Sequence, residues 1–292
     1  MIIVLTGATG SGKSSLAIKL AKIIDAEIIN GDAFQVYKDL TIATAAPTLE
    51  EKAVVPHHLF QYVPLDSSYS IAQYQKDCRD KLKEVLSRKE NVIIVGGSGL
   101  YLRSALYDYD LSLDTDAVDM APYIEKTNEE LHKILADLDE IEAKKIPVQN
   151  RQRMLRSIQI CLAAGKSKTE LLSSQKHEPI YPCKFYVLHV DRADLYPKVN
   201  ERVDIMFSQG LLEETLPLIK RYGREAQAFK AIGVKELFSY IDGELTLDEV
   251  KDQIKLYTRR YSKRQETFFR QQFQATLISS LDDILDDLNL AK

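Results

Sequence analysis

Residues 7–15, GATGSGKSS, constrain the fold of this chain more than any other stretch. An apolar run at 2–5 precedes them and the run LAIKLA at 16–21 follows, so they form a turn between a buried strand and a helix. The spacing G-x-x-x-x-G-K-[ST] of a phosphate-binding loop, or P-loop, is met by Gly7, Gly12, Lys13 and Ser14. Glycines let the backbone curl so that successive N–H groups point at one anion, and the following helix adds its positive end. The sequence therefore predicts a site for a diphosphate or triphosphate.

Two side chains of this loop add a charge and a metal ligand. Lys13 supplies a mobile positive charge for the outer phosphate, and the Ser14 hydroxyl is placed to ligate Mg²⁺. The predicted diphosphate site comprises Gly7, Ala8, Thr9, Gly10, Ser11, Gly12, Lys13 and Ser14. A P-loop alone leaves nucleotide hydrolysis, kinase chemistry and the use of another diphosphate open.

Short apolar runs recur along the chain and end in polar residues or glycine. They lie at 2–7, 27–32, 92–97 and 185–191. Helical stretches separate them, which is the pattern of a parallel sheet covered by helices. We therefore expect an α/β fold, with a P-loop NTPase-like parallel sheet and flanking helices.

A helical insertion interrupts this pattern after the third run. Between 113 and 183 the chain has charged helical stretches at 127–145 and 150–164 but no convincing strand. We expect a discontinuous catalytic core at 1–112 and 184–292, and a small helical insertion domain at 113–183. Further helices are predicted at 194–209, 211–222 and 246–275, and in the acidic tail.

Composition excludes several classes of protein. The chain has 292 residues, 45% of them hydrophobic, and no apolar run approaches the roughly 20 residues of a membrane span. Its N-terminus enters a strand at once without a charged and apolar leader, so we expect a soluble cytoplasmic protein. The net charge of −4 does not indicate a general nucleic-acid binder, although a local basic face can still bind phosphates.

We predict no metal-binding or disulfide role for the cysteines or the paired histidines. Cys78, Cys161 and Cys183 are unclustered, which argues against a disulfide scaffold or a zinc site and favours free thiols. His57 and His58 lack the spacing of metal ligands, and we interpret them as structural.

An aspartate follows the second apolar run. Asp32 lies at the C-terminal end of that predicted strand, where the ligand crevices of parallel sheets form, so we expect it to face the same cleft as the P-loop. A carboxylate there could ligate magnesium, cap the next turn or accept a proton. Its position alone favours catalysis no more than a turn cap.

Eight blocks along almost the whole chain resemble, in order, those of the tRNA dimethylallyltransferase family, the isopentenyltransferases that modify adenine in tRNA. They are GATGSGKS, DAFQVYKDLTIATAAP, PHHLFQYVPLDSSYSIAQYQ, VIIVGGSGLYLRSAL, NRQRMLRSIQI, VDRADLYPKVNERVDIMFSQGLLEE, KAIGVKEL and YTRRYSKRQETFFR. The length is similar to that of compact bacterial members. The resemblance implies a prenyltransferase that moves the dimethylallyl group of dimethylallyl diphosphate to N6 of adenosine 37, beside the anticodon, and releases diphosphate.

The resemblance also assigns roles to individual residues. It implies that Asp32 is the base for the adenine amine, that Thr9, Lys13 and Lys235 assist the transfer, and that Gln35 recognises the adenine. Ser98 stands where the family more often has threonine, so a hydroxyl is retained. The residues expected to contact tRNA are Asp32, Ala33, Phe34, Gln35, Ser98, Gln152, Arg153, Arg156, Arg259, Lys263 and Arg264.

A basic stripe supports the nucleic-acid partner. Lys251, Lys255, Arg259 and Lys263 recur every four residues, which places them on one helical face. From spacing alone, a solvated face and a phosphate-binding surface are equally good interpretations. The interleaved aromatics and the block YTRRYSKRQETFFR, through the resemblance, favour phosphate binding.

The chain departs from the family pattern in the first two blocks. Ala8 stands where the family usually has proline, Ala33 where it has serine, and Ala43 and Ala46 where it has glycine and lysine. The lost lysine removes a possible tRNA contact. We expect these changes to affect tRNA affinity and choice more than the type of reaction.

Two other functions remain open. Relatives of this family prenylate free AMP, ADP or ATP, although a free nucleotide needs no extended basic surface. A P-loop kinase would instead transfer phosphate from ATP to a small molecule. We expect Mg²⁺ as the cofactor, and a monomer with no obligate protein partner.

Overall fold

The computed structural model describes residues 1–173, 175–176 and 178–290. By contacts, the chain divides into one unit of residues 1–106 and 181–292 and a second unit of residues 107–180. The sequence pattern had placed the limits of the insertion at 113 and 183. Within the described residues, no helix is both long and apolar enough to cross a membrane.

The first unit is built on one six-stranded sheet. Its strands are β1 (Ile2–Gly7), β2 (Glu27–Asn30), β3 (His57–His58), β4 (Val92–Val95), β5 (Cys183–Leu188) and β6 (Thr276–Ile278). Their order is β3-β2-β4-β1-β5-β6, and every neighbouring pair is parallel. The predicted α/β fold with a parallel sheet is confirmed. The two edge strands β3 and β6 were not predicted, because two or three residues are too few to show a strand pattern.

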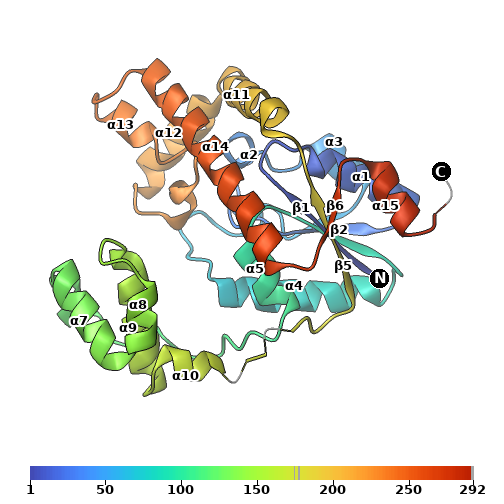
Figure 1. The fold of residues 1–292 in the computed structure, drawn as a ribbon. Coiled ribbons are helices and arrows are strands. Elements are labelled where there is room, and N and C mark those ends of the chain that lie inside the picture. Colours follow the sequence, from blue (N-terminus) through green and yellow to red (C-terminus); the bar gives the residue numbers. More distant parts are fainter. Residues whose placement is uncertain (174, 177, 291–292) are drawn as a thin grey trace. The chain divides into compact units, whose positions relative to one another are not determined.

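Helices cover both faces of this sheet (Figure 1). On one face, α1 (Lys13–Ile23) and α15 (Leu281–Asp287) pack on alternating side chains of the strands. On the other, α4 (Ile71–Leu86) contacts β2 and β4 as well as α5 (Gly99–Leu106). The long helix α14 (Leu247–Gln272) contacts both β1 and α5.

The remaining described helices of this unit lie in the chain between β2 and β3 or between β5 and α14. They are α2 (Thr41–Thr44), α3 (Leu49–Val54), α11 (Arg192–Ser208), α12 (Leu211–Tyr222), a 3₁₀ turn at Gln227–Lys230 and α13 (Leu237–Ile241). Val203 of α11, Leu237 of α13 and Val250 and Ile254 of α14 form one buried cluster. These apolar contacts fix α14 against α11.

The residues that directly follow β2 and β4 approach each other closely. Gly31, just after β2, donates its N–H to the carbonyl of Val95 at 2.8 Å. A Cβ on Gly96 would lie 2.1 Å from the backbone of Gly31, so no side chain fits there. The residues that follow these strands, Asp32 and Gly97, are thereby held at the same edge of the sheet.

The second unit is helical within its described residues, apart from an isolated bridge between Tyr107 and Pro179. It contains α6 (Ala121–Ile124), α7 (Asn128–Leu138), α8 (Glu140–Lys145), α9 (Arg151–Ala164) and α10 (Lys168–Ser173). Its core includes Leu131, Leu135, Met154 and Ile158.

The predicted helical stretch at 127–145 is broken at Asp139. Its carboxylate accepts the N–H of Glu142 at 2.9 Å and that of Thr169 at 2.7 Å, so it caps α8 and also holds α10. The Lys168 ammonium lies 2.6 Å from the buried Glu142 carboxylate. The stretch thus forms two short helices, α7 and α8, and these contacts tie α8 to α10.

Candidate active site

The P-loop joins β1 to α1 and carries the backbone geometry that its glycines allow. Gly10 and Gly12 have φ angles of +86° and +89°, in the region that side-chain-bearing residues rarely adopt. The first N–H groups of α1 have no acceptor within the helix, so they are available to an anion. The Ser11 hydroxyl is buried without a hydrogen-bond partner among the described residues, so it too can donate to such an anion.

Two cations face this loop. Burial lowers the pKa of Lys13 from 10.5 to about 8, an effect that Asp32 opposes and Arg202 adds to. The Lys13 ammonium lies 3.3 Å from the carbonyl oxygen of Ala8. Arg202, on α11, lines the same cavity, and burial lowers its pKa although Asp32 raises it. The sequence analysis missed Arg202, because a single arginine in a helix of mixed charge has no distinctive spacing.

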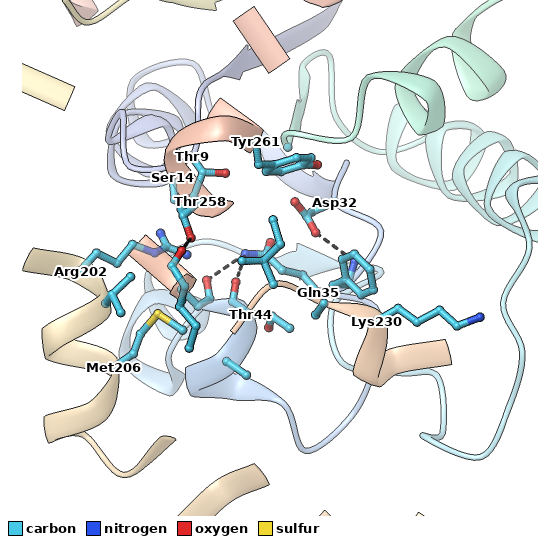
Figure 2. A pocket seen from close by; sticks show the side chains of 18 of the residues that line it. Thr9, Ser14, Asp32, Gln35, Thr44, Arg202, Met206, Lys230, Thr258 and Tyr261 are labelled. Carbon is cyan, nitrogen blue, oxygen red and sulfur yellow. Dashed lines mark hydrogen bonds between the residues drawn. The ribbon is translucent and has the colours of Figure 1, made fainter. Parts of the chain in front are cut away.

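Two cavities meet at these cations. One, of about 290 Å³, is lined by Thr9, Asp32, Gln35 and Tyr261 together with Lys13 and Arg202. In it, Asp32 and Gln35 enter from the loop after β2 and Arg202 enters from α11 (Figure 2).

The second cavity, of about 610 Å³, shares Lys13, Ser14 and Arg202 with the first and has apolar walls that include Ile28 and Phe60. The anion site therefore borders two separate hollows.

Asp32 both caps a turn and faces the cavity. Its Oδ1 accepts the N–H of Phe34 at 2.9 Å. Its Oδ2 has no hydrogen-bond partner among the described residues, and the side chain lines the cavity with Lys13. The turn cap and the catalytic base are therefore compatible, because each uses a different oxygen.

Asn30, which the sequence analysis also missed, holds the backbone of Asp32. Its Oδ1 accepts the Asp32 N–H at 2.8 Å, and its amide group donates to the carbonyls of Asp32 and Leu59, each at 3.0 Å. Asn30 is fully buried at the end of β2. These three bonds fix the direction in which the Asp32 carboxylate points.

The Gln35 side chain lines the cavity, and its amide nitrogen already has hydrogen-bond partners. Its Nε2 donates to the carbonyls of Thr44 and Ala45, at 3.0 and 2.9 Å. Both protons of Nε2 are therefore used, and the amide oxygen remains for a ligand. Nearby, the Ser98 hydroxyl accepts the N–H of Ala33 at 2.9 Å, and Phe34 also lines the cavity.

Lys235 lines the cavity but its ammonium has protein partners. It lies 3.7 Å from Glu236 and 5.8 Å from the centre of the Tyr257 ring. About half of its side chain is exposed. Arg202 borders both cavities, as Lys13 does, whereas Lys235 borders one of them.

The basic stripe of α14 packs on α11 for most of its length. Lys255 pairs with Asp204 at 2.6 Å, and the Arg259 guanidinium donates to the Asn200 side chain. Lys263 is exposed, and Arg264 is exposed at the cavity rim with its guanidinium 5.6 Å from the centre of the Tyr261 ring. The C-terminal end of the stripe is therefore the part that is exposed to a ligand, whereas Lys255 and Arg259 are paired with α11.

The predicted nucleic-acid contacts of the second unit lie on α9. Gln152, Arg153 and Arg156 are all exposed. Arg156 donates to the Thr115 hydroxyl at 2.7 Å and to Gln159, so it also holds the chain before α6.

The fold and the site define a class of protein: a P-loop enzyme that handles a diphosphate beside a carboxylate. Comparison with known sequences and structures then identifies the family. The family model for IPP transferase matches residues 35–272. The chain belongs to this family, as the resemblance implied.

Curated relatives match this chain over most of their own length and carry one printed function. The tRNA dimethylallyltransferase of Anoxybacillus flavithermus is 41% identical over 286 residues, covering 97% of this chain and 92% of the relative. That of Bacillus subtilis is 40% identical over 281 residues, covering 94% and 89%. The predicted bacterial type is confirmed by these relatives.

Solved structures agree over nearly the whole chain. The tRNA isopentenylpyrophosphate transferase of Staphylococcus epidermidis is 34% identical, with a TM-score of 0.72 and coverage of 99% of this chain and 97% of that one. A eukaryotic dimethylallyltransferase acting on tRNA is 25% identical, with a TM-score of 0.85 and coverage of 98% and 75%.

The lowered pKa of Lys13 predicts how anion binding depends on pH. Only the ammonium form attracts a diphosphate, and the bound anion raises the pKa again. Because the pKa before binding is about 8, we expect the affinity for inorganic diphosphate to fall about tenfold per pH unit above pH 8, relative to a Lys13→Met variant. Calorimetric titration of both proteins from pH 7 to 9.5 measures this, and the ratio cancels the ionisation of the ligand. Parallel pH profiles would contradict it.

Proposed function

We propose that this protein transfers the dimethylallyl group of dimethylallyl diphosphate to N6 of adenosine 37 in tRNA and releases diphosphate. The observation that carries the proposal is the free Oδ2 of Asp32 in the cavity that Lys13 and Arg202 border. A proton acceptor and an anion site in one cavity are what this reaction requires. The names of the relatives, tRNA dimethylallyltransferases, supply the substrates.

The carboxylate suits the nucleophile. The exocyclic amine of adenine is weakly nucleophilic because its lone pair is delocalised into the ring, so a base on one of its N–H groups assists attack. In the proposed step, N6 forms a bond to C1 of the allyl group, the C1–O bond breaks with its electrons leaving on the diphosphate, and one N6 proton passes to Asp32. Asn30 holds the carboxylate in place through the Asp32 backbone.

The cations suit the leaving group. Departure of diphosphate builds negative charge that Lys13, Arg202 and the N–H groups of the P-loop are placed to stabilise. Lys235, at the cavity wall, is the further cation that the family resemblance assigns to this task.

Mg²⁺ fits the donors at this site. The ion is usually held by one or two protein oxygens together with substrate phosphates and waters. The Ser14 hydroxyl is exposed in the first turn of α1, beside the anion site, and would be the protein ligand. When bound, Mg²⁺ would neutralise part of the charge on the leaving diphosphate.

The two hollows suit a reaction of two substrates. The larger hollow has apolar walls and reaches the same cations as the smaller one, which contains Asp32. A diphosphate with an apolar tail and an adenine can thus approach the cations by separate routes. We further propose that the enzyme acts as a monomer and meets its tRNA in the cytoplasm.

The identity of the acceptor is tested by direct competition. We expect incubation with dimethylallyl diphosphate and Mg²⁺ to add one dimethylallyl group per molecule of unmodified tRNA at adenosine 37, as read by mass spectrometry of digested tRNA, and to leave AMP unchanged. Prenylated AMP with unmodified tRNA would instead identify a nucleotide prenyltransferase. Phosphate transfer from ATP with dimethylallyl diphosphate untouched would identify a kinase.

Asp32→Asn tests the proton acceptor. The amide keeps the size of the side chain and its turn cap but cannot take the proton, so we expect kcat to fall about 10²- to 10⁴-fold with tRNA affinity unchanged. Asp39→Asn, an exposed aspartate in the same loop, is the matched control and we expect it to keep full activity. Turnover by Asp32→Asn at the wild-type rate would remove Asp32 from the mechanism.

The exposed basic residues predict the salt dependence of tRNA binding. Each phosphate contact that is lost reduces the slope of log affinity against log salt by about 1. We expect Arg153→Gln and Lys263→Gln each to lower the slope in this way, because both side chains are exposed. Lys22→Gln, an exposed lysine on α1, serves as the control of equal charge change. Equal slopes for all three variants and the wild type would exclude these contacts.

A further inference from the structure

One face of α14 carries buried polar side chains directed at the P-loop. Thr258, Ser262 and Gln265 are all less than a tenth exposed. The hydroxyls of Thr258 and Ser262 donate to backbone carbonyls one turn earlier in the helix, at 2.7 and 3.0 Å. The longer Gln265 makes its bonds outside the helix, so its burial requires partners in other elements.

The Gln265 amide joins two loops of the active site. Its Nε2 donates to the carbonyl of Gly97 at 2.9 Å. Its Oε1 accepts the backbone N–H of Thr9 at 2.8 Å and lies 3.1 Å from the Thr9 hydroxyl. The close approach depends on a glycine, because a Cβ on Gly97 would lie 2.2 Å from Nε2.

These partners fix which end of the amide is oxygen. A backbone carbonyl can only accept and a backbone N–H can only donate, so the Gln265 nitrogen must face Gly97 and its oxygen must face Thr9. An amide oxygen carries no proton. The hydrogen bond between Gln265 and the Thr9 hydroxyl therefore uses the proton of threonine.

The direction of this bond determines what Thr9 offers to the cavity. Its only hydroxyl proton is directed at Gln265, so its lone pairs are left for the cavity that it lines with Asp32. An oxygen in this state accepts a hydrogen bond from an amine and cannot donate one to a phosphate oxygen. In addition, the Ser262 hydroxyl lies 3.2 Å from the Thr9 carbonyl and shares its one proton between that oxygen and the carbonyl of Thr258, so α14 also contacts the backbone of Thr9.

We propose that Gln265 is a positioning residue that makes the Thr9 hydroxyl an acceptor for the adenine amine. The inference rests on the proposed function, since it concerns the same amine. One N6–H then points at Asp32, which takes its proton, and the other points at the Thr9 oxygen, which holds it. The amine is thereby oriented with its lone pair toward the allyl carbon.

The test combines Gln265→Leu with Thr9→Val, which removes the hydroxyl at nearly constant shape. Misplacement of a reacting group costs about 10²-fold in rate, so we expect each single variant to lower kcat about 10- to 100-fold while the KM for dimethylallyl diphosphate changes less than threefold. Because Gln265 acts through Thr9, we expect the double variant to be no slower than the slower single variant. Multiplying losses would overturn the proposal.

Controls separate this inference from folding and from the proposed function. Gln271→Leu makes the same change at an exposed position of α14, and we expect it to keep wild-type kcat and thermal stability. If Gln265→Leu does not fold, Gln265→Met fills the same space with a flexible apolar chain and we expect the same kinetic result. Failure of the wild-type protein to prenylate tRNA would overturn the proposed function and with it the acceptor role of Thr9, whereas hydrogen exchange tests the contact between Gln265 and Thr9 by itself.

Hydrogen exchange tests the contact without any catalytic readout. The Thr9 N–H is bonded to Gln265 in the structure, so we expect its exchange to be at least tenfold faster in Gln265→Leu than in the wild type, while that of Ile28, in the sheet, is unchanged. Equal protection of the Thr9 amide in both proteins would overturn the proposal, whatever reaction the enzyme catalyses.

Discussion

The positive charge gathered at the P-loop is the constraint on which the rest of the site depends. Burial lowers the pKa of both Lys13 and Arg202, and the Arg202 charge lowers that of Lys13 further. Asp32 opposes both shifts from the far side of the cavity. Under the proposed function, a diphosphate would balance both cations and leave Asp32 to accept a proton.

Helix α14 links that charge centre to the outer surface. Its buried face supplies Ser262 and Gln265 to the P-loop, and its next face pairs Lys255 and Arg259 with α11. Its C-terminal end exposes Lys263 and Arg264. The same helix therefore contacts Thr9 on its buried face and exposes basic side chains at its C-terminal end.

Sequence reasoning predicted the elements that local patterns encode. The four longer strands, the P-loop and the helices of the second half follow from apolar runs, glycine spacing and helical periodicity, and all are present. Asp32 was placed in the cleft because parallel strands end at one edge. Arg202 and Gln265 were missed because their roles arise from contacts between segments far apart in sequence, at separations that no local period records. The pairing of Lys255 with Asp204 was hidden for the same reason.

The order of segments along the chain has a consequence for biosynthesis. The P-loop strand β1 lies between β4, which precedes the insertion, and β5, which follows it, and β6 closes the sheet with residues 276–278. A ribosome releases Gln265 and strand β6 long after the P-loop. A nascent chain therefore carries the phosphate-binding motif long before it has the helix that holds Thr9, and its pocket stays incomplete until that helix has been synthesised.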